Sequence, residues 1–156
     1  MGIELQADLR AALQDSSSLK ALASVDKNGN PHVVFKGSIS LDETERNLQY
    51  LEIVETSQTN RNLVYSIWFK KKVAINVLTA DGKSWQIKGV PVKAHISGPE
   101  FERQYVKLQE LMGADADLST VWIIEPVEET GQTLQIRVAE ERARYPLIGH
   151  LDRFRA

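Results

Sequence analysis

The spacing of hydrophobic residues changes several times along the chain, and each change predicts a boundary between elements. Near the N-terminus apolar residues recur at helical spacing between polar ones, which predicts an amphipathic helix over about residues 3–14. Runs rich in β-branched and aromatic residues then predict six or seven strands. These strands cover about residues 19–25, 32–39, 48–54, 73–78, 85–96 with a bend at Gly89 and Pro91, 121–127 and 133–138.

Turn signals join several of these strands directly. The segment from Asp26 to Pro31 contains Asn-Gly, which tolerates positive φ and predicts a hairpin. A second hairpin is predicted around residues 129–132. Two further helices are expected, one over residues 62–69 with Leu63, Ile67 and Trp68 facing the core. The other is expected from a capping box, residues 97–100, to about Gly113.

Consecutive strands at short spacing favour an antiparallel arrangement, and the helices are too few for repeated βαβ units. The sequence therefore predicts a mainly β fold, a barrel with peripheral helices. Its length of 156 residues predicts one domain over residues 1–156. The charged segment over about residues 139–156 is interpreted as a variable tail, with possible docking points at Tyr145, Pro146, Leu147, Ile148 and Leu151.

Composition excludes several classes of protein. The net charge is −2, and domains that bind nucleic acid nonspecifically need an excess of Lys and Arg. The absence of cysteine excludes disulfides, Cys-ligated metals and thiol nucleophiles, and is consistent with a cytoplasmic location. Three scattered histidines, His32, His95 and His150, do not indicate a metal site. We expect no signal peptide and no membrane-spanning segment.

The segment from Thr56 to Leu63 carries three hydroxyls and Arg61 at a predicted helix start. Backbone N–H groups there lack helical partners and the helix dipole makes that end partly positive, so the segment suits a phosphate. The alternative is a simple N-cap with polar surface residues, since Thr, Ser and Asn commonly cap helices.

The order of elements resembles the flavin-binding split barrel of the pyridoxamine 5'-phosphate oxidase-like superfamily over roughly residues 22–94. The resemblance rests on the hairpin of residues 23–36, the hydroxyl-rich segment, and the strands of residues 73–77 and 85–89. It implies an antiparallel split β-barrel that binds flavin mononucleotide (FMN) without a covalent bond, at a homodimer interface. That superfamily usually has Ser-x-Lys where this chain has Thr59-Asn60-Arg61.

The same resemblance implies a set of cofactor-binding residues. Hydroxyls and a basic residue at the helix start would hold the phosphate, Lys36 would stabilise the reduced ring, and polar residues on one strand would meet the ring or ribityl chain. The implied residues are Lys36, Thr56, Ser57, Thr59, Arg61, Asn62, Gln86 and Lys88. Each also has an ordinary interpretation as a cap residue or as a polar residue on an exposed strand face. Trp68 and Trp85 are further candidates to cover the ring, although Trp68 is expected in the core.

The resemblance favours an FMN-dependent oxidoreductase that exchanges hydride or electrons with a nicotinamide donor or another small organic molecule. A true pyridoxamine phosphate oxidase is not expected, because residues 142–155 lack that enzyme's C-terminal aromatic and basic pair. Two alternatives remain open. One is a non-catalytic flavin-binding or haem-handling module, such as a redox sensor or carrier, and the other is a small barrel that binds something else. The substrate and the catalytic residues stay unknown.

Overall fold

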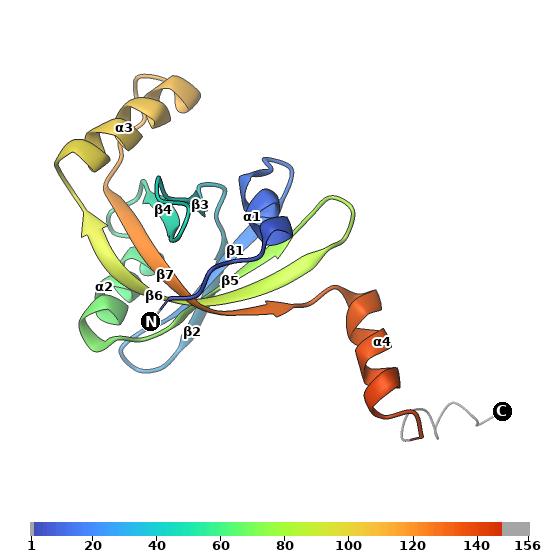
Figure 1. Ribbon diagram of the computed structural model, residues 1–156. Coiled ribbons are helices and arrows are strands. Elements are labelled where there is room, and N and C mark those ends of the chain that lie inside the picture. The colour runs from blue at the N-terminus through green and yellow to red at the C-terminus, as the bar shows by residue number, and fades with distance from the viewer. Residues whose placement is uncertain (1, 148–156) are drawn as a thin grey trace.

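A computed structural model describes residues 2–147 of the chain. In these residues seven strands form one antiparallel sheet, in the order β2-β1-β5-β6-β7-β4-β3, with four helices around it (Figure 1). The strands are β1 (Leu19–Val25), β2 (Pro31–Phe35), β3 (Ser40–Leu41), β4 (Leu48–Glu52), β5 (Val73–Leu78), β6 (Ser84–His95) and β7 (Thr120–Gly131). The helices are α1 (Ala7–Gln14), α2 (Gln58–Phe69), α3 (Pro99–Met112) and α4 (Leu134–Arg144).

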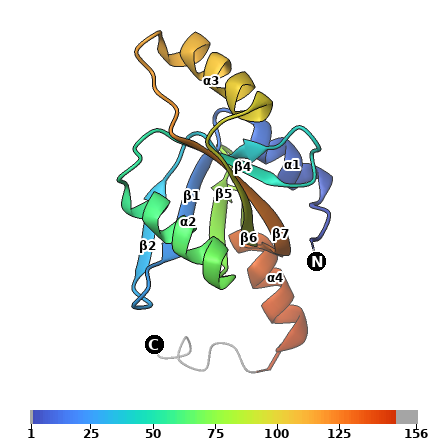
Figure 2. The ribbon, with the colours of Figure 1, turned by 90° about the vertical axis from the view of Figure 1, so that its left-hand side faces the viewer.

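The sheet curls around one hydrophobic core but does not close. Its edge strands are β2 and β3, so the barrel is split between them, and residues 36–39 cross the split. The inward positions alternate with outward ones, as in β5, where Val73, Ile75 and Val77 are buried. Helix α1 packs against β3 and β5, and α2 against β1 and β6 (Figure 2), adding Leu9, Leu13 and Leu63 to the core. The predicted mainly β split barrel is confirmed.

The longest strand pair, β6 with β7, contains the predicted irregularity. Its register shifts between Lys88 and Gly89 and again between Pro91 and Lys93. A Cβ on Gly89 would lie 2.6 Å from Ile124 Cγ2 and 2.9 Å from the Glu125 carbonyl oxygen. Glycine is therefore required here because the neighbouring strand approaches too closely for a side chain.

Helices α3 and α4 lie at opposite ends of the molecule, outside the barrel (Figures 1 and 2). Leu108 of α3 packs on a second small cluster with Leu118, Val121 and Ile123, so α3 is anchored to the outer face of β7. Helix α4 projects from the end of β7 and buries none of its residues.

Several expected elements differ from those observed. The predicted closing hairpin is wrong, because β7 continues to Gly131 and residues 134–144 form α4. The alternation of Leu134, Ile136 and Val138 resembles a strand, but strong helix formers such as Glu140 and Glu141 follow it. The strand expected over residues 133–138 is thus the first half of a helix.

Helix boundaries also shift. The predicted capping box is wrong, because α3 has Gly98 as its N-cap, with φ of 93° and no side-chain capping bond. The first helix starts at Ala7 rather than residue 3, and α2 starts four residues before the predicted position, directly after Ser57. Trp68, expected in the core, is 77% exposed. The proposed docking residues beyond position 147 lie outside the described residues.

Among the described residues, no helix has both the length and the apolar character needed to cross a membrane.

Candidate functional site

Helix α2 begins at Ser57, and its hydroxyl group serves two partners. The Ser57 Oγ accepts a 3.0 Å hydrogen bond from the Asn60 backbone N–H, as an N-cap residue does. It also donates a 2.8 Å hydrogen bond to Glu52 Oε2. The other carboxylate oxygen, Glu52 Oε1, accepts from the Val54 N–H at 2.9 Å. A carboxylate of the chain itself therefore lies at the start of α2, where the helix dipole favours negative charge.

The Glu52 carboxylate also bonds to the hydroxyl of Tyr50, two residues earlier on β4. The Tyr50 oxygen donates to Glu52 Oε2 at 2.5 Å, and both side chains are almost fully buried. Burial first, and then the hydrogen bond and negative charge of Glu52, raise the pKa of Tyr50 well above its usual range. On the other side, Lys36 Nζ lies 5.3 Å from the centre of the Tyr50 ring, a cation–π distance. A continuous chain of contacts thus links Lys36 to α2.

This chain of contacts borders a cavity of about 910 Å³ at the split of the barrel. The size lies within the roughly 300–1,000 Å³ of small-molecule sites. Its lining comes from the end of β2 and the residues that follow it through β3, from β4 and the residues after it, and from α1 and α3. The lining includes Phe35, Lys36, Ser38, Ile39, Tyr50, Leu51, Glu52, Ile53 and Val54.

A buried lysine, Lys20, also lines the cavity but has a structural task. Its ammonium donates to the Leu13 carbonyl at 3.0 Å and to the Ile39 carbonyl at 2.7 Å. Because Leu13 lies in the last turn of α1, the cation caps the negative end of that helix. Burial lowers the pKa of Lys20. We therefore separate Lys20 from the residues available to a ligand.

Some side chains of the hydroxyl-rich segment are exposed to solvent and others are buried in the protein. Thr56 and Arg61 are exposed, whereas Thr59 is 1% exposed. Asn62 is also buried: its amide donates to Ser24 Oγ at 3.0 Å and accepts from Gln58 Nε2 at 2.7 Å. Of the five residues predicted in this segment, Thr56 and Arg61 therefore have side chains free to approach a ligand from solvent.

The three candidates on strands lie on opposite faces of the sheet. Lys36 follows β2 opposite Lys20, on the face that lines the cavity. Gln86 and Lys88 share one face of β6, as predicted, but it is the face opposite to buried Trp85 and Ile87. Within one chain the structure therefore does not bring Gln86 or Lys88 to Lys36. Trp85 is a core residue, 7% exposed.

The outward face of β1, β2 and β5 is unusually apolar for an exposed surface. Phe35 is 76% exposed, Val33 66% and Leu19 55%. Leu19 pairs with Leu78, and Phe35 pairs with Ala21, so these side chains are neighbours across the strands. We refer to Leu19, Val33, Phe35 and Leu78 as the outer apolar face. Contiguous exposed apolar surface of this kind is typical of interaction sites.

The sequence reasoning missed Tyr50 and Glu52 as parts of the site. A signal was present: within the strand-like run at residues 48–54, a Tyr and a Glu two residues apart must share a face. This spacing did not indicate that the face of Tyr50 and Glu52 is buried. The other face also combines a polar residue, Gln49, with an apolar one, Leu51, so hydrophobicity does not distinguish the two faces.

The residues of the site fit the ring of a flavin better than they fit its phosphate. The cavity beside Lys36 offers an apolar slot with a cation at its edge, which suits the ring. The start of α2 offers Thr56, Arg61 and first-turn N–H groups to a phosphate, but Glu52 occupies its inner side. A phosphate there must approach from the solvent side, past the buried carboxylate.

No protein-family model and no curated protein sequence matches this chain. Among solved structures, the chain is similar to a candidate pyridoxamine 5'-phosphate oxidase from Lactobacillus delbrueckii. The two share 20% sequence identity with a TM-score of 0.65, over 81% of this chain and 93% of the other.

Two further structures have the same fold. One is an FMN-binding protein from Syntrophomonas wolfei, with 16% identity and a TM-score of 0.62 over 81% of this chain and 83% of that one. The other is HutZ, a heme storage protein from Vibrio cholerae, with 16% identity and a TM-score of 0.59 over 83% and 95%. The chain has the split-barrel fold of the pyridoxamine 5'-phosphate oxidase-like proteins, and at these identities the likeness shows the fold alone.

Proposed function

We propose that this split barrel binds FMN noncovalently in the cavity at its split and acts as a homodimeric oxidoreductase. The observation that carries the proposal is the position of Lys36. It lies at the rim of the cavity and is linked through Tyr50 and Glu52 to the start of α2. A ring-binding slot and a helix start thus occur within one connected set of residues.

The cation at Lys36 is the group best suited to act on a bound ring. Its ammonium lies over the neutral Tyr50 ring, and it has no carboxylate within ion-pair distance among residues 2–147. An uncompensated ammonium can stabilise negative charge that develops on a reduced flavin. The flavin supplies the redox chemistry when bound, and the protein binds and orients it.

The homodimer is proposed from two facts together. The first is that the side chains of the outer apolar face are more exposed than is usual for apolar residues on a surface that contacts only solvent. The second is that Gln86 and Lys88 lie on the outward side of β6, away from the cavity of their own chain. A second copy seated on the outer apolar face would cover it. Gln86 and Lys88 of one copy could then reach a flavin held mainly by the other.

The phosphate is proposed to lie at the solvent side of the start of α2, near Thr56 and Arg61. Helix N–H groups and a guanidinium together favour a doubly charged anion. The buried Glu52 carboxylate opposes it by charge repulsion. This balance predicts a modest affinity, set largely by Arg61.

Titration of the purified protein with FMN, followed by flavin fluorescence and absorbance, tests the proposal. We expect saturable binding, and a roughly tenfold higher dissociation constant for Lys36→Met, because one charge-assisted contact contributes about 1.5 kcal/mol. Lys27→Met, in the exposed β1–β2 turn, is the matched control and should bind as the unmodified chain does. If Lys36→Met and the control bind FMN equally, the ring does not lie at Lys36.

Haem is the second ligand to test, because one protein of the same fold is described as a heme storage protein. The same titration can be made with haemin, whose binding is followed by its Soret absorbance. Tight haem binding without FMN binding would replace the flavin proposal. Flavin binding followed by reduction with a nicotinamide under anaerobic conditions would favour an enzyme over a carrier.

A further inference from the structure

The α3 end of the cavity carries polar groups that the proposed flavin site does not use. Two amides line it, Gln49 from β4 and Gln104 from α3. Gln49 is 8% exposed and Gln104 is 7% exposed. Within residues 2–147 neither side-chain amide has a hydrogen-bond partner in the protein, and the amide atoms of both remain accessible from the cavity.

One face of α3 supplies the remaining lining. Gln104, Leu108 and Leu111 follow at intervals of four and three residues, so they share a face, and Lys107 lies next to them. All four line the cavity together with Met112. Leu111 is 85% exposed and Met112 63% exposed, so this face presents apolar surface beyond its buried anchor, Leu108.

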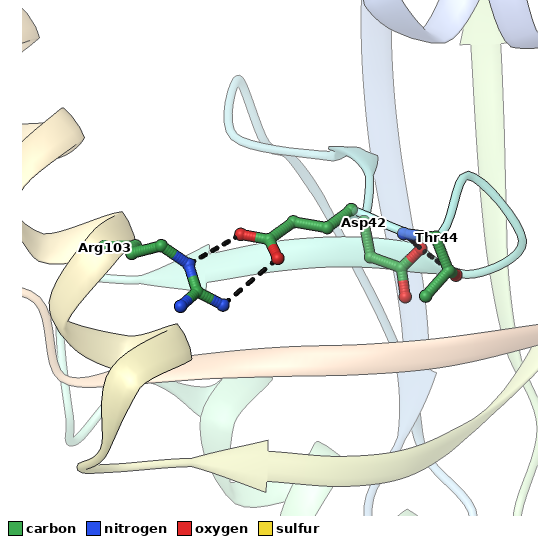
Figure 3. A network of polar contacts seen from close by, with 4 residues as sticks. Asp42, Thr44 and Arg103 are labelled. Carbon is green, nitrogen blue, oxygen red and sulfur yellow. Dashed lines mark hydrogen bonds and ion pairs between the residues drawn. The ribbon is translucent and has the colours of Figure 1, made fainter.

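The acidic residues near this end already have partners. Arg103 bridges from α3 to Glu43, with Nε 2.8 Å from Oε1 and Nη2 3.1 Å from Oε2 (Figure 3). Asp42 accepts from the Thr44 hydroxyl at 2.6 Å within the β3–β4 turn. The bidentate pair holds α3 against that turn and neutralises Glu43, whereas Asp42 is held by neutral donors from Thr44 and Asn47.

Lys107 places a positive charge at this end of the cavity, where the Asp42 carboxylate, held by neutral donors, keeps its negative charge. Lys107 has no carboxylate within ion-pair distance among the described residues, whose ion pairs are Arg103–Glu43 and Arg137–Glu140. Two side-chain amides and one ammonium group, none with a partner in the part of the chain that the structure describes, therefore line the same cavity. Amide N–H and ammonium groups are the donors that a carboxylate accepts from.

We propose that the α3 end of the cavity binds an amphipathic organic carboxylate. Its carboxylate accepts hydrogen bonds from Gln49, Gln104 and Lys107, and its apolar body lies against Leu108, Leu111 and Met112. This binding does not require the flavin, and an acid bound here would share one cavity with a ring at Lys36.

Calorimetric titration with 2-naphthoate, without FMN, tests the proposal directly, and 2-naphthylmethanol serves as the neutral analogue of similar shape. We expect saturable naphthoate binding that is at least tenfold tighter than binding of the alcohol. Gln104→Leu and Lys107→Met should each weaken naphthoate binding severalfold while leaving binding of the alcohol nearly unchanged. Gln109→Leu, on the same helix but outside the cavity lining, is the matched control and should bind as the unmodified chain does.

Stability provides a second measurement. The Gln104 amide makes no hydrogen bond within residues 2–147, so Gln104→Leu removes none there and should keep or raise the melting temperature. A clear loss of stability in that variant would mean that the amide is a structural group, and would overturn its role. Equal affinity for the acid and the alcohol, or naphthoate binding unaffected by both Gln104→Leu and Lys107→Met, would overturn the site. The naphthoate titration and the melting temperature are both measured without FMN, so neither result depends on whether the protein binds FMN.

Discussion

The hydroxyl of Tyr50 donates a 2.5 Å hydrogen bond to the carboxylate of Glu52, and both side chains lie inside the barrel. The same carboxylate accepts from Ser57 and from the Val54 N–H, so it joins β4 to the start of α2. A buried charge is tolerated only when it is fully hydrogen-bonded, and here three donors surround it. The pair therefore fixes the geometry of the helix start on which the proposed phosphate site depends.

Replacing Tyr50 with Phe should change how stability depends on pH. The pKa of Tyr50 is raised in the folded state, so above about pH 10 the unfolded chain loses this proton first and folding becomes less favourable. The contribution is fully present below that pH. The unmodified chain should lose stability faster than Tyr50→Phe between pH 9 and pH 11, as urea unfolding at each pH would measure. Parallel curves for the two proteins would contradict the raised pKa.

Replacing Glu52 with Gln should destabilise the fold by about 1.5–3 kcal/mol, because charge-assisted bonds from buried donors are lost. Chemical unfolding at pH 7 measures the difference. Glu110→Gln, exposed on α3, is the control and should change stability by less than about 0.5 kcal/mol. A Glu52 variant as stable as this control would show that the buried network contributes little.

Charge at the start of α2 should act on flavin affinity in two directions. Arg61→Ala should weaken FMN binding by about 1.5–3 kcal/mol through loss of a contact to phosphate. Glu52→Gln should strengthen it, because a buried negative charge beside the phosphate is removed. Fluorescence titration of both variants, with riboflavin as the ligand lacking phosphate, separates the effects. Equal changes for FMN and riboflavin would remove the phosphate from this position.

Gly89→Ala should cost about 1–3 kcal/mol, because the added Cβ would meet Ile124 and the Glu125 backbone at less than 3 Å. The matched control is Gly131→Ala, at the end of β7, where nothing lies within 4 Å of the added atom. That substitution should be neutral or slightly stabilising. Thermal unfolding of the two variants compares them, and similar melting temperatures would contradict the close approach of β6 and β7.

Phe35→Glu should abolish the proposed dimer, because it places a charge at the centre of the outer apolar face. Sedimentation velocity at micromolar concentration measures the result. Ile96→Glu, which replaces a side chain that is 70% exposed beyond the end of β6, is the control and should leave the assembly unchanged. If the unmodified chain is already monomeric, the outer apolar face does not hold a second copy.

The sequence alone determined those strands and turns whose pattern of apolar and turn-forming residues is compatible with a single type of element. Strands β1 and β5 have the predicted bounds, since alternating or continuous apolar runs between clear turn signals leave little choice. The Asn-Gly turn before β2 and the irregularity at Gly89 were predicted for the same local reason. The split barrel itself was expected from the order of these elements.

Tertiary structure alone decided which face of each element meets the core. Periodicity indicates that Tyr50 and Glu52 share a face and that Gln49 lies on the other, but not which of the two faces the main core. It could not separate exposed Thr56 from buried Thr59, nor place Trp68 in solvent. The Gln49 and Gln104 amides meet one cavity only because α3 packs on β7. Burial depends on contacts between residues distant in sequence, which a local pattern does not contain.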